Sequence, residues 1–392
     1  MGQKPEIKSI ARFDHCYGCG VCSFACPQHA ISMEMNSNGF FSPVVGGNCN
    51  QCSLCLNVCA FNSGTKSFKE PLSAYVGWSK NESIRDNCTS GGVVFELCSE
   101  FITQGYKVCA VKYNYEDHRA EHFIFDTVDD LYLAAGSKYL QSYTADALSA
   151  IDLKNERYVI VGTPCMISSM RTLAKIHRAE NKIILIDFFC HGVPSYLMWN
   201  KYLKHVKKQV GNISSISWRN KDNGWQESKA IKAKGELGRY LSFMSNGDLF
   251  FDFFLKDRCL NECCFDDCIF KLTNSDADIR VGDMWSREPK YVNNRLGVNS
   301  ILALTPRGKF ALNTTAGIHL EAQELQMVLG TQLKSNPKRP VSYNYVKRAM
   351  QKTTSLLTIE KKASLMEYYC RFVQPNYYKT IYKRILQKLF IW

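Results

Sequence analysis

Eight cysteines near the start of the chain form two rows with the same internal spacing. The rows are Cys16, Cys19, Cys22 and Cys26, followed 33 residues later by Cys49, Cys52, Cys55 and Cys59. Three thiolates spaced in this way can bind three corners of a cubane cluster, while the fourth cysteine of the row faces the neighbouring cluster. We therefore predict two 4Fe-4S clusters, one held by Cys16, Cys19, Cys22 and Cys59, and the other by Cys26, Cys49, Cys52 and Cys55.

The segment between the two rows predicts a β-hairpin, because the strand-like stretches Ile31–Met35 and Phe40–Val44 flank the tight turn Asn38-Gly39. This layout resembles a two-cluster bacterial ferredoxin and covers residues 1–67. The alternative is a pair of four-cysteine zinc sites, although such sites usually draw their cysteines from two separated pairs.

Two later cysteines follow predicted parallel strands. Tyr158–Val161 is a short apolar strand that leads to Cys165, and after the helix Met166–His177 the buried strand Lys182–Phe189 leads to Cys190. A strand–helix–strand order predicts a parallel sheet, and ligands bind at the carboxyl ends of its strands. We expect these two cysteines to lie close together and to complete a third 4Fe-4S cluster with Cys264 and Cys268, although the spacing leaves open which of Cys259, Cys263 and Cys264 is the ligand.

Several polar turns offer hydrogen-bond donors to an anionic group. Ser90-Gly91-Gly92 opens the predicted helix Val93–Phe101, where backbone N–H groups are free to bind an anion. Further donors come from a loop and a turn that hold Ser137, Lys138, Tyr139, Gln141, Ser142, Thr163 and Pro164. A predicted strand and tight turn over residues 216–225 add the cations Arg219 and Lys221.

Taken together, these motifs resemble those of the family of coenzyme F-420 hydrogenase/dehydrogenase beta subunits over roughly residues 10–300. Further marks are Cys190-His-Gly-Val-Pro194 and the segment from Asp278 to Trp285. The resemblance implies an iron–sulfur flavoprotein, containing FAD, that passes electrons between its clusters and a small substrate. It also implies domains at 75–150 and 155–310, between the ferredoxin domain 1–67 and a helical basic tail at 325–392. The expected fold class is α+β and α/β, with a mixed α/β flavin-binding body.

If this resemblance holds, the donors of Ser90-Gly91-Gly92, Lys138 and Thr163 would hold flavin phosphate and ring oxygens. Arg219 and Lys221 would stabilise negative charge on reduced flavin or bind an anionic substrate. His191 is the candidate proton donor, because histidine titrates near neutral pH, and its alternative role is that of a hydrogen-bonded turn residue.

The implied partners are a redox protein or ferredoxin and a small substrate, either coenzyme F-420-type or another molecule. Two other functions remain open at this point. One is that of an electron-transfer subunit, without its own substrate, that docks a catalytic partner. The other is a ferredoxin fused to a non-flavin enzyme, such as a nucleotide-sugar modifier.

Composition narrows the class of protein further. The 392 residues are 45% hydrophobic and 22% charged, which suits several folded domains. The formal charge is +13, and the ten Lys/Arg against two Asp/Glu from residue 340 onward contribute +8 of it. The remainder is only mildly basic, so nucleic acid is not an expected partner.

The expected location is the cytoplasm, because no secretory signal or spanning segment is evident and 18 cysteines suit a reducing compartment. In the tail, Ile381, Ile385 and Leu389 share one helical face among basic residues. Such a helix can lie peripherally on the inner face of a membrane or pack against protein.

Overall fold

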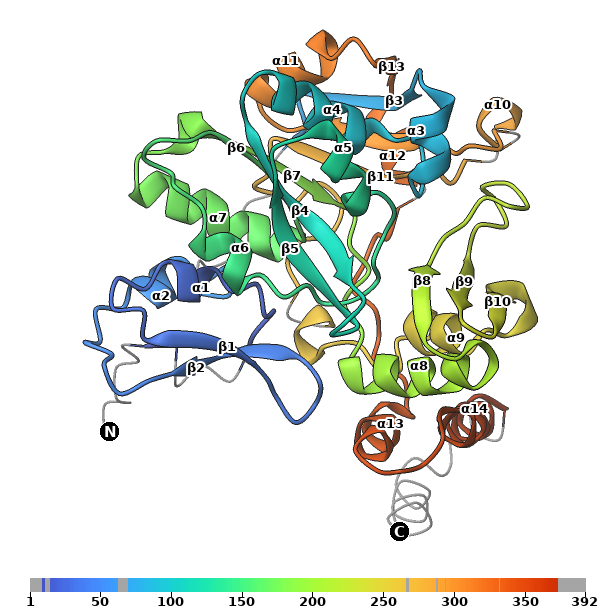
Figure 1. Ribbon diagram of the computed structural model, residues 1–392. Helices are drawn as coiled ribbons and strands as arrows, with labels where there is room; N and C mark the ends of the chain where they lie inside the picture. Colours follow the sequence, from blue (N-terminus) through green and yellow to red (C-terminus); the bar gives the residue numbers. More distant parts are fainter. Residues whose placement is uncertain are drawn as a thin grey trace.

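Figure 1 shows the computed structural model, which describes residues 9–10, 15–62, 70–265, 268–286, 288–292, 294–330 and 332–372. The fold is mixed α/β. A small ferredoxin-like region lies beside a large mixed sheet, and a second, three-stranded sheet with its helices lies on the other side (Figure 1). The tail residues Ile381, Ile385 and Leu389 and most of the linker after Asn62 lie outside the described residues.

The ferredoxin-like region contains the predicted hairpin. Strands β1 (Ile31–Met35) and β2 (Phe41–Val45) pair antiparallel, with Ile31 opposite Val45. Each cysteine row contains one short helix, α1 (Val21–Phe24) or α2 (Leu54–Asn57), and the two helices contact each other. The cysteines are thereby carried on two short helical turns that face one another above the hairpin (Figure 1).

The large sheet has eight strands in the order β13-β3-β12-β11-β7-β6-β4-β5. Strands β4, β6, β7 and β11 are parallel neighbours, and the flanking strands are antiparallel. The bounds in chain order are β3 Ser73–Ser79, β4 Lys107–Asn114, β5 Arg119–Phe125, β6 Tyr158–Val161, β7 Ile183–Phe188, β11 Ile279–Asp283, β12 Asn299–Ala303 and β13 Ile318–Gln323. Strands from both predicted segments, 75–150 and 155–310, therefore share one sheet, and the domain boundaries themselves stay a prediction.

Helices cover both faces of this sheet because its central strands are apolar on both sides. In β7, Ile184 and Ile186 face one core with α4 (Val93–Thr103) and α11 (Pro306–Thr314), whereas Ile183 and Leu185 face the other. That second core contains α7 (Pro164–Ile176) and side chains of α1. The shorter helices are α3 Glu82–Asn87, α5 Val128–Leu131, α6 Ala145–Ser149, α10 Pro289–Val292 and α12 Leu325–Gly330.

The three-stranded sheet encloses an aromatic core. Its antiparallel strands are β8 (Ile213–Ser217), β9 (Ala230–Gly235) and β10 (Gly238–Phe243). The core is closed by helices α8 Tyr196–Val210, α9 Leu249–Leu255, α13 Tyr343–Met350 and α14 Leu356–Phe372. No helix in the described part of the chain is both long and apolar enough to cross a membrane.

Two local expectations need comment. The Ser195 hydroxyl accepts a hydrogen bond from the Leu197 N–H at 3.1 Å and so caps α8, as predicted. The strand expected over residues 216–221 instead ends at Ser217, the last residue paired with β9. Beyond that point the chain leaves the ladder, because the Arg219 guanidinium turns inward to donate to the hydroxyl of Ser228.

One buried side chain joins the ferredoxin-like region to the large sheet. The Gln141 carbonyl oxygen accepts from the Phe41 N–H at 2.6 Å, and its amide nitrogen donates to the Tyr17 carbonyl at 3.1 Å. Gly18 makes this approach feasible, because a Cβ there would stand 1.8 Å from the Gln141 amide nitrogen. The two regions are therefore held in register by hydrogen bonds to buried backbone groups, which need such partners.

We predict that Gln141→Leu lowers the free energy of unfolding by about 1–3 kcal/mol, because it leaves the Phe41 N–H buried without a partner. Gln351 provides a matched control, since its exposed amide bonds the Ser37 carbonyl of the same hairpin. Gln351→Leu should change stability by no more than about 0.5 kcal/mol. Denaturant titration under anaerobic conditions measures both, and equal effects of the two variants would contradict this role.

Candidate functional site

The first predicted ligand set surrounds a small cavity. Cys16, Cys19, Cys22 and Cys59 all line it, together with Ile10, Tyr17 and Ser169. Burial raises the pKa of the Cys16 thiol to about 12 and that of Cys19 to about 11, so without a metal these groups would be protonated. A set of buried, convergent thiols fits an iron–sulfur cluster, which binds them as thiolates.

The second predicted set lies nearer the surface. Cys55 is close enough to Cys49 and Cys52 that their charges would raise its pKa further, after burial as the main cause. Cys26 and Cys55 pack in the same apolar cluster, and Cys52 is exposed. In the described residues no three His, Cys, Asp or Glu side chains are gathered closely enough around one point to hold a single metal ion.

The third predicted set is brought together from three distant segments. Cys165 begins α7, Cys190 follows β7, and Cys264 and Cys268 follow the loop after α9. After burial, the charges of Cys190 and Cys264 raise the pKa of the Cys165 thiol, and all four cysteines line one large cavity. Close packing here needs a glycine, because a Cβ on Gly192 would stand 3.1 Å from the Cβ of Cys264.

The other two cysteines near this set lie elsewhere. Neither Cys259 nor Cys263 is among the residues that line the large cavity. Cys259 packs in the aromatic core beside the ion pair of Arg258, whereas Cys263 lies near Cys16. The placement favours Cys264 among the three candidates that the sequence left open.

The first and third sets are neighbours across a thin wall. Tyr17 and Cys19 line both cavities, and the Cys19 sulfur lies 3.8 Å from the Ser169 hydroxyl, one helical turn beyond Cys165 in α7. The Tyr17 ring stacks on Phe61 with ring centroids 4.3 Å apart and meets Phe270 edge-on at 6.0 Å. Aromatic side chains therefore fill the space between the two sets.

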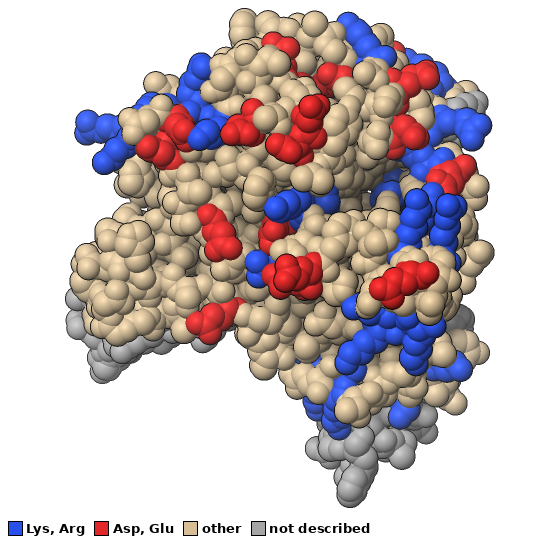
Figure 2. Space-filling view, viewed as in Figure 1, with Lys and Arg blue, Asp and Glu red and all other residues tan. Residues whose placement is uncertain are grey.

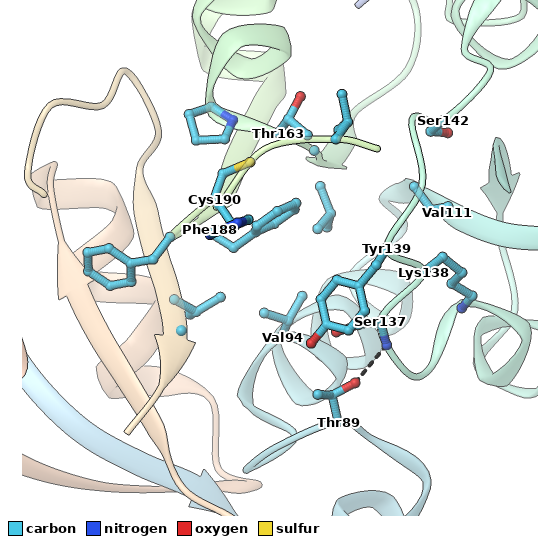
Figure 3. A pocket seen from close by; sticks show the side chains of 18 of the residues that line it. Thr89, Val94, Val111, Ser137, Lys138, Tyr139, Ser142, Thr163, Phe188 and Cys190 are labelled. Atoms are coloured by element: carbon cyan, nitrogen blue, oxygen red, sulfur yellow. Dashed lines mark hydrogen bonds between the residues drawn. The ribbon is translucent and has the colours of Figure 1, made fainter. Parts of the chain in front are cut away.

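The large cavity has a volume of about 670 Å³, which is within the usual range for a cofactor or small-molecule site. Figure 3 shows hydroxyl, amine and apolar side chains around it, including Thr89, Lys138, Tyr139, Thr163 and Phe188. The Ser137 N–H donates to the Thr89 hydroxyl at 2.7 Å, which ties the 136–142 loop to the turn that precedes α4 (Figure 3).

Most of the predicted flavin-binding residues line this cavity, namely Ser90, Gly92, Ser137, Lys138, Tyr139, Gln141, Ser142, Thr163 and Pro164. Gly91 does not line it, and a Cβ there would lie 2.8 Å from the Gly77 carbonyl oxygen. The Lys138 ammonium donates to the carbonyls of Leu133 and Ala135, and burial lowers its pKa to about 7.

The three predicted catalytic residues are placed differently. His191 lines the cavity with its Nε2 atom 2.7 Å from Asp257 Oδ1, and Arg219 lines it with its guanidinium 2.9 Å from Asp283. Lys221 is not part of the lining. Its ammonium donates to three backbone carbonyls, those of Arg85, Ser90 and Leu296, so it holds loops together behind the cavity.

One further cavity residue escaped the sequence analysis. His122, on β5, accepts from the Ser142 hydroxyl at Nδ1 over 2.7 Å and donates from Nε2 to the Val161 carbonyl over 3.1 Å. Burial lowers its pKa to about 4, so the imidazole is neutral at pH 7. No motif surrounds His122 in the sequence, and only the pairing of β4 with β5 and β6 brings it to the cavity.

We predict that stability falls as the pH drops from about 6.5 towards 4, because the unfolded chain protonates His122 in this range and the folded chain does not. The expected contribution is about 1.4 kcal/mol per pH unit. His122→Gln should remove that part of the slope, while the exposed control His177→Gln should retain it. Denaturant unfolding at several pH values tests this, and identical slopes for wild type and His122→Gln would rule it out.

Comparison with known proteins identifies the family. The models described as coenzyme F420 hydrogenase/dehydrogenase, beta subunit, match residues 74–149 (N-term) and 155–327 (C terminus), and a 4Fe-4S dicluster domain matches residues 15–99. An F(420)H(2) dehydrogenase protein of Methanosarcina mazei, one of the subunits of that enzyme, is 26% identical over 221 residues, which are 52% of this chain. The match spans 61% of that relative's length.

Among solved structures, a chain of the F420-reducing [NiFe] hydrogenase complex from Methanosarcina barkeri aligns with a TM-score of 0.47 at 12% identity, covering 76% of this chain and 93% of its own. The motif-based resemblance is confirmed by the family models. The chain belongs to the family of coenzyme F420 hydrogenase/dehydrogenase beta subunits and carries a 4Fe-4S dicluster domain, which makes it an iron–sulfur electron-transfer protein related to oxidoreductase subunits.

Proposed function

We propose that this protein is an iron–sulfur flavoprotein oxidoreductase that passes electrons between 4Fe-4S clusters and a flavin, which exchanges them with a small substrate. One observation carries the proposal. The third cysteine set and the predicted flavin-binding residues line the same cavity, and Tyr17 and Cys19 connect that cavity to the first cysteine set. The sites for single-electron and two-electron chemistry are thus contiguous.

The cavity suits a flavin in size and in the character of its walls. Val94, Val111 and Phe188 offer apolar contacts for a planar ring, and the hydroxyls of Ser142 and Thr163 offer polar ones (Figure 3). A flavin bound there would couple single-electron transfer to hydride transfer. FAD is the form that we propose.

The chain's own residues would supply charge and protons at this site. Arg219 is oriented by Asp283 and by the Tyr139 hydroxyl, at 3.1 Å, and so presents a fixed positive charge to developing negative charge. His191, beside Asp257, is the proposed proton donor. Lys138 is a second candidate for proton exchange near neutral pH, because its pKa is lowered to about 7.

The names of the similar proteins suggest substrate and partners. Reduced coenzyme F420 is the first substrate to assay, since the similar Methanosarcina mazei protein belongs to an F(420)H(2) dehydrogenase. We propose a redox protein, either a ferredoxin or a further subunit, as the partner at the ferredoxin-like region, where Cys52 is exposed. Cytoplasmic location and contact of the tail with a membrane remain proposals.

Filling the cavity tests the flavin. We expect Val94→Trp to reduce flavin content from about one per chain to under about a tenth, because the indole occupies space that the ring needs. Iron content should not change. Thr103→Trp, at the exposed end of the same helix α4, is the control and should keep its flavin.

Flavin content is read from the visible spectrum and from flavin released on denaturation after anaerobic purification. Wild-type protein that holds iron but no flavin would contradict the proposal and favour an electron-transfer subunit, without its own substrate.

Iron analysis tests the third cluster. Wild-type protein should contain about twelve irons per chain, and Cys264→Ser about eight, because one cubane is lost. Cys259→Ser is the matched control, since Cys259 is also buried but does not line the cavity, and it should keep about twelve. About eight irons in the wild type would eliminate the third cluster.

A further inference from the structure

Lys271 is a cation placed against the third cysteine set, although no motif includes it. Its ammonium donates to the Cys190 carbonyl at 2.7 Å and to the His191 carbonyl at 3.3 Å, and the side chain lines the large cavity. In the part of the chain that the structure describes, these neutral carbonyls are its hydrogen-bond partners, and no carboxylate is within ion-pair distance.

The other cations near the set are neutralised. Arg280 is fully buried and forms two hydrogen bonds with Asp187, at 2.7 and 2.6 Å. Arg219 pairs with Asp283 at 2.9 Å. Of the three cations, Lys271 is therefore the one whose positive charge is not balanced by a described carboxylate.

The ferredoxin-like region offers a contrast. Residues 15–62 contain one Glu, Glu34, and no Asp, Lys or Arg. Figure 2 shows the corresponding lobe, where Figure 1 places β1 and β2, as a largely uncharged surface. The described lining of the first cavity contains no Lys or Arg.

We infer that Lys271 raises the reduction potential of the cluster held by Cys165, Cys190, Cys264 and Cys268, a step that rests on the proposed function. Reduction adds one negative charge to a cluster already bound by four thiolates, so a nearby cation stabilises the reduced form more than the oxidised one. Burial raises the pKa of the Cys190 thiol, and the charge of Lys271 is the largest effect that opposes it. Electrons that enter through the ferredoxin-like clusters are thereby drawn to the cluster beside the flavin.

The test is a redox titration of the anaerobically purified holoprotein, followed by EPR. Lys271→Gln keeps hydrogen-bond donors but removes the charge, and it should shift this cluster's potential to a more negative value, with an equilibrium constant for reduction about tenfold smaller. Lys271→Arg should stay close to wild type, as should the exposed control Lys175→Gln on α7. Asp266 and Asp267 are unchanged in every variant, so the difference reports Lys271 alone.

The Cys264→Ser variant identifies which EPR signal belongs to this cluster. An unchanged potential in an iron-replete Lys271→Gln protein would overturn the inference and leave the proposed function intact, whereas about eight irons in the wild type would overturn the third cluster itself. If Lys271→Gln does not retain the cluster, the wild-type order decides. The cluster beside Lys271 should then have the highest potential of the three, and any lower rank would overturn the inference.

Discussion

A single turn of helix α7 sets the spacing between the two halves of this protein. Cys165 and Ser169 stand four residues apart and so point from the same side of the helix, separated by about 6 Å along its axis. Cys165 lines the large cavity, while the Ser169 hydroxyl accepts from the Ala60 N–H at 3.1 Å and contacts Cys19. The distance between the first and third cysteine sets is therefore determined by helix geometry rather than by flexible loops.

The parallel centre of the large sheet makes that helix possible. Strands β6 and β7 end at one edge, so the turn before Cys165 and the loop after Cys190 start from neighbouring positions. The same edge brings Tyr139 and Arg219 to the cavity from outside the sheet. The bonds of Gln141 then hold the ferredoxin-like region against this edge. Packing, hydrogen bonding and the chemistry proposed for the cavity thus depend on one strand–helix–strand unit.

Local patterns in the sequence predicted much of this arrangement. The cysteine spacing, the Asn38-Gly39 turn and the apolar strand 158–161 are determined by neighbouring residues, and the structure agrees with the hairpin and with the parallel strands. Side chains that act over long distances were beyond reach. His122 reaches the cavity only through sheet pairing, and Lys221, predicted as a site cation, donates instead to three backbone carbonyls. Composition and spacing carry no information about which way such side chains point.

The exposure of Cys52 has a consequence for handling the protein. Cys16, Cys19 and Cys22 are partly or largely enclosed, whereas Cys52 is open to solvent at the rim of the ferredoxin-like region. Dioxygen and chelators reach solvent-facing thiolates before enclosed ones. Damage in air would then begin at the outermost cofactor and travel inward, and a preparation that has lost its entry point can still look intact around the inner cavity.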